Sequence, residues 1–475
     1  MKTAFYRITK GTAAVFLFAM FPFCWRAEGP LKFGIDVLKE EGFERLKEQK
    51  IGILTHAPAT DSNNTPTYKV FLNSKIRNNI VCFFSPEHGL SATAKAGERI
   101  ENERLDGIPV YSLYKNEGSK EDPKWAPTKE QLEKIDTLVV DLCDVGVRCY
   151  TYITCMRFAI EQCIRYGKRV VVLDRPNPLG RKLSGPFMDE DLQGYVGGFC
   201  IPHLHGMTIG EIAQFLVKHY QKHPWLKELM PEQLKGVLDN KQLEVVKMKN
   251  YRPNALWSGQ KFKKSYFWHP PSPNLPNFNS CLAYSCMIPM QIHGNFKTIL
   301  ASERVSESGE AQPFRFFCMY HKDDDVKPIV KYLNEKKLAG VAFKVAKNGE
   351  ADGIVLNITD WKKFDPGACM LRMMQVDKKL DIDKKRRNKL YILSEEGFKM
   401  CTDRDKDLPF SKYANFDKKG EYWSVARSLI GEKSLIEALS DPKAISDEWI
   451  PKHLKEWKDR AQVFEKERSD CLLYD

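Results

Sequence analysis

The sequence predicts an α/β fold, in which a Rossmann-like, mostly parallel sheet is followed by a smaller α/β domain. Three runs support this prediction, because each is short and apolar and stops abruptly on acidic or polar residues: 81–85, 137–142 and 169–173. Near-continuous apolar runs are typical of strands buried on both faces of a parallel sheet. In such a sheet, the polar residues that follow the strands meet in one crevice, where ligands bind.

Strand and helix patterns alternate through the first half of the chain, which is typical of an α/β domain. In chain order we expect a helix at 35–46, a strand at 50–56, a helix at 68–76, a strand at 81–85, a short strand at 108–113, a strand at 137–142, a helix at 150–166 and a strand at 169–173. A long loop rich in Gly and Pro follows the last of these strands.

A capping box predicts the next helix. Thr208 is followed three residues later by Glu211, which is the spacing at which two side chains satisfy free N–H groups at a helix start. His205 should therefore lie just before a helix N-terminus. A strand-like run at 243–248 closes the first, Rossmann-like domain, which we place at residues 28–250.

The second domain begins with a segment that is too rich in Pro for regular structure. Residues 251–276 include Trp257, Trp268 and the run His269-Pro-Pro-Ser-Pro-Asn-Leu-Pro276, so this segment is either a linker or a wall of the active-site cleft. Strand-like runs at 340–345 and 353–358 and a charged helical stretch at 449–467 follow. We assign residues 251–475 to a C-terminal α/β auxiliary domain that includes the Pro-rich segment.

The first 27 residues predict a secretory signal peptide. Basic residues precede an apolar stretch at 12–23, which is too short to span a bilayer, and Ala27 offers a cleavage site. Two alternatives are a lipoprotein signal at Cys24, which the preceding Phe-Pro-Phe disfavours, and a short buried strand. We expect an exported protein, periplasmic or extracellular, with no transmembrane segment apart from the signal.

The cysteines do not follow the spacing of a disulfide framework, although 13 of them in an exported chain would ordinarily suggest one. Cys143, Cys149 and Cys155 recur every six residues, which cannot place them on one helix face. Others, such as Cys82 and Cys163, lie inside apolar runs, so we interpret most cysteines as small buried hydrophobic residues. No Cys-x-x-Cys or His-Glu-x-x-His pattern appears, and we expect no metal site.

The net charge of +12 has a simple explanation in a solvated basic surface, to which the stretch 377–389 contributes. The functional alternative is attraction to anionic polymers of the cell envelope or to a membrane surface. Nucleic acid is a disfavoured partner, because the chain carries an export signal and no recognised nucleic-acid-binding module.

Polar groups gather at the expected strand and loop ends in four clusters: Glu87 with His88, Asp141 with Asp144 and Arg148, Asp174 with Arg175 and Asn177, and His203 with His205. Most have a structural alternative. Asp141 equally fits a turn cap, and Asp144 with Arg148 fits an ion pair at helical spacing. Asp174 with Arg175 fits a local ion pair, and His205 fits a hydrogen bond to loop backbone.

Glu87 is the strongest candidate for a catalytic residue. Pro86 and Gly89 fix it at a bend after an apolar strand, and exposure to water does not explain a glutamate at that position. A carboxyl group that is partly desolvated in a crevice can hold a proton and donate it. Cleavage of a glycosidic bond needs such an acid, together with a second carboxylate or the substrate's acetamido group to stabilise positive charge. The fingerprints of dinucleotide sites, phosphate loops and esterase nucleophile elbows are absent.

Ordered motifs from about Gly34 to Tyr474 resemble a single family, the peptidoglycan exo-β-N-acetylmuramidases of the NamZ type, formerly the DUF1343 family. The motifs are Ser85-Pro-Glu-His-Gly89, Gly107-Ile-Pro-Val-Tyr-Ser-Leu-Tyr114, Asp141-Leu-Cys-Asp-Val-Gly-Val-Arg-Cys-Tyr-Thr-Tyr152, Leu173-Asp-Arg-Pro-Asn-Pro-Leu-Gly180, His205-Gly-Met-Thr-Ile-Gly-Glu211 and Pro271-Ser-Pro-Asn-Leu-Pro276.

The resemblance implies a Rossmann-like catalytic domain, a smaller C-terminal domain, and a cleft between them that removes terminal N-acetylmuramic acid from peptidoglycan fragments. It implies no metal and no organic cofactor. Glu87 carries over as the catalytic acid, and we expect Asp144 as its catalytic partner. Sugar or lactyl-carboxylate contacts are expected from His88, Arg148, Tyr150, Tyr152, Asp174, Arg175, Asn177, His205 and Asn274.

Physical chemistry narrows some of these roles. Arg148 or Arg175 is suited to the lactyl carboxylate through a bidentate charge-assisted pair. Tyr150 and Tyr152 suit stacking on a pyranose face, although core packing at a helix start explains them equally well.

Two departures from the family pattern bear on activity. Cys143 stands where the family usually has Gln, which exchanges a strong hydrogen-bonding amide for a weak thiol. The stretch 298–314 also lacks the family's Arg-Gly pair. We therefore carry three hypotheses: an active exo-muramidase, a catalytically degenerate glycan-binding relative, and another hydrolase of the cell envelope.

Overall fold

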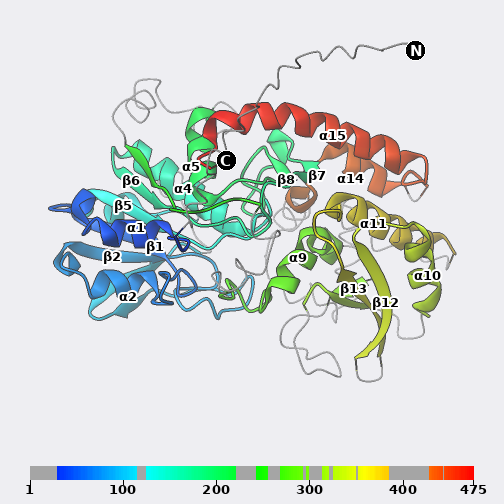
Figure 1. Ribbon diagram of the computed structural model, residues 1–475, viewed down its shortest axis with the longest axis horizontal. Coiled ribbons are helices and arrows are strands. Elements are labelled where there is room, and N and C mark those ends of the chain that lie inside the picture. The colour runs from blue at the N-terminus through cyan, green and yellow to red at the C-terminus, as the bar shows by residue number, and fades with distance from the viewer. Residues whose placement is uncertain are drawn as a thin grey trace, which may run out of the picture.

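The structure of the protein is a computed structural model that describes residues 29–114, 125–220, 242–254, 268–292, 296–298, 313–319, 325–348, 351–383, 427–441 and 443–474. The predicted signal peptide, most of the stretch 298–314 and part of the basic stretch 377–389 lie outside these ranges. Figure 1 shows two lobes, one built around the sheet that contains β1, β2, β5 and β6, the other around β12 and β13.

The first lobe contains a seven-stranded sheet in the order β3-β4-β2-β1-β5-β6-β9. Its strands are β1 (Ile51–Thr55), β2 (Ile80–Ser85), β3 (Glu103–Leu105), β4 (Ile108–Ser112), β5 (Thr137–Asp141), β6 (Arg169–Leu173) and β9 (Leu243–Val246). Every pairing is parallel except that of the edge strand β3 with β4. Counted in chain order, the parallel strands follow the 3-2-1-4-5-6 arrangement of a Rossmann fold, so the fold prediction is confirmed.

Helices cover both faces of this sheet, as the continuous apolar strands require. They are α1 (Gly34–Glu40), α2 (Thr67–Leu72), α3 (Lys129–Glu133), α4 (Thr151–Arg165) and α5 (Ile209–Lys218), with single turns η1 (Glu44–Leu46), η2 (Arg77–Asn79) and η3 (Glu190–Leu192). On β5, Leu138 and Val140 join the core under α4 and α5, whereas Val139 joins the core with α1 and α2. The alternation shows that the strand is buried on both sides.

The predicted Gly- and Pro-rich loop contains a small antiparallel pair, β7 (Ser184–Phe187) with β8 (Pro202–Leu204). The helix predicted from the capping box begins where expected, at Ile209, because the Thr208 hydroxyl accepts a hydrogen bond from Glu211 N and the Glu211 side chain accepts one from Thr208 N. His205 lies just before this helix start, as predicted.

The second lobe is a smaller α/β unit, which also agrees with the prediction. Its antiparallel sheet has the order β10-β11-β13-β12. The strands are β10 (Phe296–Thr298), β11 (Phe316–Met319), β12 (Val341–Asn348) and β13 (Ala351–Ile358), and the helices are α9 (Phe278–Met287), η6 (Ile288–Ile292), α10 (Lys327–Glu335), α11 (Pro366–Asp383), α14 (Lys433–Ser440), α15 (Trp449–Arg468) and η8 (Ser469–Cys471).

Helix α15 joins the two lobes, since it runs along the top of both in Figure 1 and ends beside α5. Its residue Phe464 packs edge-on against Phe187 of β7 and Phe215 of α5. One hydrophobic core accordingly extends through both lobes, with Val140 at one end and Phe343 of β12 at the other. The last described residues therefore return to the first lobe.

The cysteines whose side chains the structure describes are free thiols, and most of them are buried, as the sequence indicates. Burial raises the pKa of the Cys82 thiol to about 12, so it carries no charge at neutral pH. Within the described ranges, the helices include none with the length and apolar character needed to cross a bilayer.

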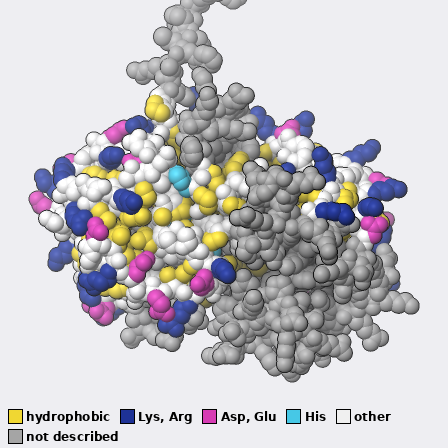
Figure 2. All heavy atoms as spheres, turned by 90° about the horizontal axis from the view of Figure 1, so that it is seen from below, with side chains coloured by type: hydrophobic (Ala, Val, Ile, Leu, Met, Phe, Trp, Pro, Cys, Tyr) yellow, Lys and Arg dark blue, Asp and Glu magenta, His cyan; other side chains and the backbone are white. Residues whose placement is uncertain are grey.

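The surface charge is dispersed on the face drawn in Figure 2. Lys and Arg side chains lie around the rim of that face with Asp and Glu among them. On the described part of this face, basic and acidic side chains are therefore interspersed.

Candidate functional site

The candidate site lies at the carboxyl ends of β1, β2 and β5. The strand order reverses between β1 and β5, and open α/β sheets bind ligands at such a switch point. Thr55 at the end of β1 is in register with Asp141 at the end of β5. The residues that follow these strands, His56 and Cys143, are joined by a hydrogen bond from Cys143 N to His56 Nε2 at 2.9 Å.

Glu87 follows β2 in a tight bend. Gly89 N donates to Pro86 O, and both His88 and Gly89 have positive φ, at 73° and 76°. The Glu87 side chain is 7% exposed, and its Oε2 accepts a hydrogen bond of 2.7 Å from the Thr151 hydroxyl, at the first residue of α4. Its Oε1 accepts a bond of 3.1 Å from Gly97 N. The bend and α4 together hold the carboxyl group in one place.

His88 and Tyr152 make hydrogen bonds that fix the backbone around Glu87. His88 Nδ1 lies 2.7 Å from Ala94 O, which closes the loop after the bend. The fully buried Tyr152 donates a hydrogen bond from its hydroxyl to Pro271 O at 2.7 Å, and the same hydroxyl lies 3.1 Å from Glu87 O. Tyr152 therefore links the acid to the Pro-rich segment and presents no face to a sugar ring.

Asp144, His205 and Tyr150 form a second group of polar side chains. Asp144 Oδ2 accepts a hydrogen bond from Gly146 N at 2.7 Å and lies 3.6 Å from His205 Nε2. His205 Nδ1 accepts a bond from Met207 N, which places the proton of the neutral ring on Nε2, toward Asp144. Asp144 and His205 are therefore brought together.

Two buried atoms in this group, Asp144 Oδ1 and His205 Nε2, have no hydrogen-bond partner among the residues that the structure describes. The Tyr150 hydroxyl interacts with the side chains of Tyr152 and Ser272. Burial holds the pKa of Tyr150 well above its usual range, and the negative charges of Glu87 and Asp144 add to the rise. Tyr150 is thus a neutral hydrogen-bond donor near both carboxylates. Buried polar atoms without partners are costly, and they suit a site in which a polar ligand supplies the missing bonds.

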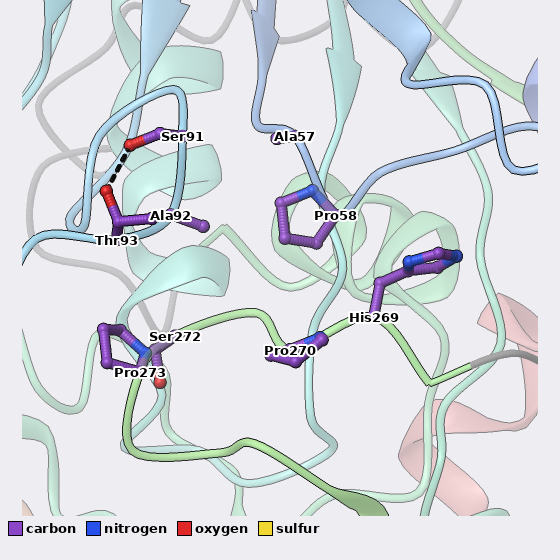
Figure 3. A pocket seen from close by; sticks show the side chains of 9 residues that line it. All are labelled: Ala57, Pro58, Ser91, Ala92, Thr93, His269, Pro270, Ser272 and Pro273. Atoms are coloured by element: carbon purple, nitrogen blue, oxygen red, sulfur yellow. Dashed lines mark hydrogen bonds between the residues drawn. The ribbon is translucent and has the colours of Figure 1, made fainter. Parts of the chain in front are cut away.

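A pocket of about 500 Å³, within the range of small-molecule sites, is lined in part by the loop that follows Glu87. Figure 3 shows its walls: Ala57 and Pro58 after β1, Ser91 to Thr93 in the loop after Glu87, and the Pro-rich segment with His269, Pro270, Ser272 and Pro273. The half-buried Asn274 is the next residue of that segment. The Pro-rich segment is therefore a wall of the site, one of the two alternatives left open above.

His56 is a site residue that the sequence reasoning missed. It is fully buried, packs edge-on against Tyr152 at 4.8 Å, and has a pKa well below the usual range because of burial and the positive charges of Arg175 and His88. Its Nε2 accepts from Cys143 N, so the neutral ring carries its proton on Nδ1. The sequence feature that could have identified His56 as a site residue is its position directly after the strand at 51–55.

Arg148 and Arg175 are occupied by the protein itself. Arg148 is fully buried, and its guanidinium donates to the backbone oxygens of Pro186, Ile201, Leu429 and Ile430. Arg175 forms a buried bidentate pair with Asp141 and also donates to Thr60 O. Neither forms the local ion pair considered from the sequence, with Asp144 or with Asp174.

Asn177 and Asp174 also make structural contacts. Asn177 donates from its amide to Met207 O at 2.9 Å and accepts from Leu179 N at 2.8 Å. Asp174 accepts four hydrogen bonds, at 2.6 to 2.9 Å, whose donors are the Tyr474 and Thr208 hydroxyls and the backbone N–H groups of Gly210 and Arg175. Both residues fix the loop that carries His205.

Asp174 makes a pH-dependent contribution to stability. Burial raises its pKa to about 7, and Glu211 adds to the rise, whereas the usual Asp pKa is 3.8. Between these values the folded state keeps a proton that the unfolded state has lost, so this stabilisation is present below pH 4 and is lost as the pH rises through 7. We expect the unfolding free energy to fall by a few kcal/mol between pH 4 and 8, at about 1.4 kcal/mol per pKa unit.

Chemical denaturation across this pH range, for the wild type and for Asp174→Asn, measures that contribution. The amide keeps the size of the side chain and cannot ionise, so the variant should lose this part of the pH dependence. Identical pH dependence in the two proteins would show that Asp174 does not titrate in this range.

Cys143 makes contacts with the residues that follow β1. Its thiol donates to Pro58 O at 3.4 Å, and burial raises its pKa to about 11, so it is not a thiolate at neutral pH. The thiol therefore makes only a weak hydrogen bond at the position where the resemblance leads us to expect an amide.

Two family descriptions match most of the chain. Residues 51–279 match the N-terminal part of the exo-beta-N-acetylmuramidase NamZ, and residues 299–474 match its C-terminal part. The chain belongs to the NamZ family. The resemblance described from the motifs is thereby confirmed, as is the prediction that the chain is a glycoside hydrolase.

Individual relatives agree with this family assignment. The chain is 29% identical to the peptidoglycan beta-N-acetylmuramidase NamZ of Bacillus subtilis over 347 residues, which cover 70% of this chain and 73% of the relative. A DUF1343 family protein of Bacteroides fragilis has the same fold, with a TM-score of 0.68 and 25% identity over 94% of this chain and 99% of that protein. A second protein of that organism and family, with a TM-score of 0.54 and 21% identity, covers the same shares.

Proposed function

We propose that this NamZ-family chain removes terminal β-linked N-acetylmuramic acid from peptidoglycan fragments, with Glu87 as the general acid. The observation that carries the proposal is the placement of Glu87, whose side chain is buried just after β2 and is followed by the loop residues 91–93 that line the pocket. The Bacillus subtilis relative is a peptidoglycan beta-N-acetylmuramidase, which supports the choice of substrate.

In the proposed reaction, Glu87 donates a proton to the glycosidic oxygen as the bond from that oxygen to the anomeric carbon breaks. Positive charge then develops on the sugar ring. Asp144 is our candidate for stabilising this charge, because its Oδ1 has no hydrogen-bond partner in the described chain and its other oxygen faces His205. Water completes the hydrolysis, with Glu87 as the base that accepts a proton.

Polar contacts to the sugar are assigned to side chains near Asp144 and near the pocket. The Tyr150 hydroxyl and the His205 ring suit hydroxyl and acetamido oxygens, and His205 Nε2 has no hydrogen-bond partner among the described residues. The pocket is large enough for one amino sugar, and its proline and alanine walls offer apolar contacts. Asn274 follows Pro273 of the pocket wall and is proposed as a further sugar contact.

The test of the proposed function compares two chromogenic substrates, a β-N-acetylmuramide and the matching β-N-acetylglucosaminide, which lacks the lactyl group. We expect the purified full chain to release the chromophore from the muramide only. Binding of the muramide without turnover would instead support the glycan-binding alternative, and turnover of the glucosaminide alone would contradict the proposed specificity.

Export is a separate part of the proposal, supported by the basic and apolar pattern of residues 1–27 and by the location of peptidoglycan outside the inner membrane. We expect the protein in the periplasmic or extracellular fraction, with a new N-terminus near Ala27. Fractionation followed by N-terminal sequencing tests this, and an uncleaved protein in the cytoplasmic fraction would contradict it.

A further inference from the structure

The segment 468–474, which we call the C-terminal clasp, binds directly to the loop that carries His205. Arg468 is 1% exposed, and its Nη1 donates hydrogen bonds of 2.9 Å to both His205 O and Gly206 O. Its Nη2 lies 3.3 Å from Arg181 O. The buried guanidinium of Arg468 therefore contacts three backbone oxygens of the first lobe. The residues that carry these oxygens precede Arg468 by more than 260 positions in the sequence.

The contact at Gly206 is too close for any other residue. Gly206 has a φ of +61°, which L side chains rarely adopt, and a Cβ there would lie 2.6 Å from Arg181 O and closer still to Arg468 Nη1. The loop and the guanidinium are thus fitted to each other. Displacement of Arg468 would leave buried carbonyl oxygens without donors, which is costly.

A second set of contacts fixes the other end of the clasp. Leu473 N donates to Glu211 Oε1 at 2.8 Å, and the same carboxylate is paired with Arg181. The Tyr474 hydroxyl donates to Asp174 Oδ2 at 2.6 Å and accepts from Met248 N at 2.8 Å. Because Asp174 and Glu211 also hold the start of α5, the clasp secures both sides of the turn at 205–208.

The geometry of this turn sets the direction of the His205 ring. Arg468 holds the His205 carbonyl, and Met207 N donates to His205 Nδ1 at 3.3 Å. Both the carbonyl group and the Nδ1 atom of His205 are therefore constrained. The other ring nitrogen, Nε2, lies 3.6 Å from Asp144 Oδ2. Any shift of the turn would change this distance.

We propose that Arg468 is a positioning residue for the active site, which keeps His205 against Asp144, and that Tyr474 supports it through Asp174. The inference rests on the proposed function, since it concerns residues assigned to the reaction. It adds that the site in the first lobe is incomplete without the clasp. Small misplacements of reacting groups can cost about 10²-fold in rate, so a modest loosening has a measurable effect.

The test uses Arg468→Lys, which keeps the charge and loses the fork that reaches three carbonyl oxygens, and Tyr474→Phe, which loses only a hydroxyl. Lys458→Ala, on the exposed side of α15, is the matched control. For each we measure kcat, KM and the pH profile of kcat/KM with the muramide, well below the thermal unfolding midpoint. We expect about a 10-fold loss of kcat for Arg468→Lys, a smaller loss for Tyr474→Phe, an altered pH profile for both, and no change for the control.

A double-mutant cycle with His205→Gln decides whether the effect passes through His205. If it does, Arg468→Lys costs little further activity once His205 is replaced. Effects that simply multiply, or a lowered unfolding midpoint with unchanged kcat and pH profile, would overturn the inference. If Arg468→Lys does not fold, the cycle with Tyr474→Phe decides in the same way. An inactive wild type would instead refute the proposed function, and the inference with it.

Discussion

Replacing Glu87 by Gln is expected to lower kcat for the muramide by about 10²–10⁴-fold, the usual effect of losing a general acid. The amide has the same size and can keep both contacts, because its oxygen accepts from Gly97 N and the Thr151 hydroxyl can turn to accept from its nitrogen. The fold should therefore be unchanged. Steady-state kinetics of the purified variant, with its circular dichroism spectrum, measure the effect.

Two comparisons make this test specific for acid catalysis. Glu98→Gln applies the same change to an exposed side chain of the following loop and should leave kcat unaltered. The leaving group of a chromogenic nitrophenyl substrate departs without protonation more readily than the sugar alkoxide of a natural disaccharide. The loss of kcat in Glu87→Gln should therefore be larger with the disaccharide than with the chromogenic substrate. Equal losses on both substrates would argue against proton donation by Glu87.

Replacing Arg148 by Ala should destabilise the protein by about 3–5 kcal/mol, because it leaves several buried carbonyl oxygens without a hydrogen-bond donor. The variant loses the donor of four backbone carbonyl groups, and two of these, Leu429 O and Ile430 O, belong to the segment that leads into α14. Burial lowers the pKa of Arg148 to about 10, so the side chain is still charged at neutral pH. Denaturant unfolding at pH 7 measures the loss.

Arg99→Ala is the control for this prediction, since Arg99 is exposed and pairs with the exposed Glu101, and such pairs contribute about 0–1 kcal/mol. The lactyl-carboxylate role considered from the sequence makes the opposite prediction. In that case, Arg148→Ala would raise KM for the muramide, leave the unfolding free energy near the wild-type value, and affect the glucosaminide much less.

Local sequence patterns predicted the elements of the fold well. The Thr208 and Glu211 capping box placed the start of α5 correctly, because a cap depends on residues three positions apart. The strand that ends before Glu87 was also recognised, since continuous apolar residues are required wherever both faces of a sheet are covered. The short pair β7 and β8 was missed, because Gly185 and Pro186 read as loop signals.

The side-chain roles were harder to predict, because they depend on partners far away in the sequence. Arg148 looked suited to an anionic ligand, yet its acceptors are carbonyl oxygens that no side-chain pattern reveals. Arg175 pairs with Asp141 across adjacent strands rather than with its neighbour Asp174. His56 escaped notice for the same reason, since its site contacts come from the other side of the strand switch point.

The clasp also has a consequence for how the protein folds. The bonds Arg468 to His205, Arg148 to Ile430 and Tyr474 to Asp174 join residues that are 263, 282 and 300 positions apart. Contacts over such separations form late, because the entropy of closing long loops must be overcome first. The sheet can therefore assemble first, whereas the His205 turn is completed only when the residues near position 470 dock against the first lobe. Catalytic competence should accordingly be the last property that the folding chain acquires.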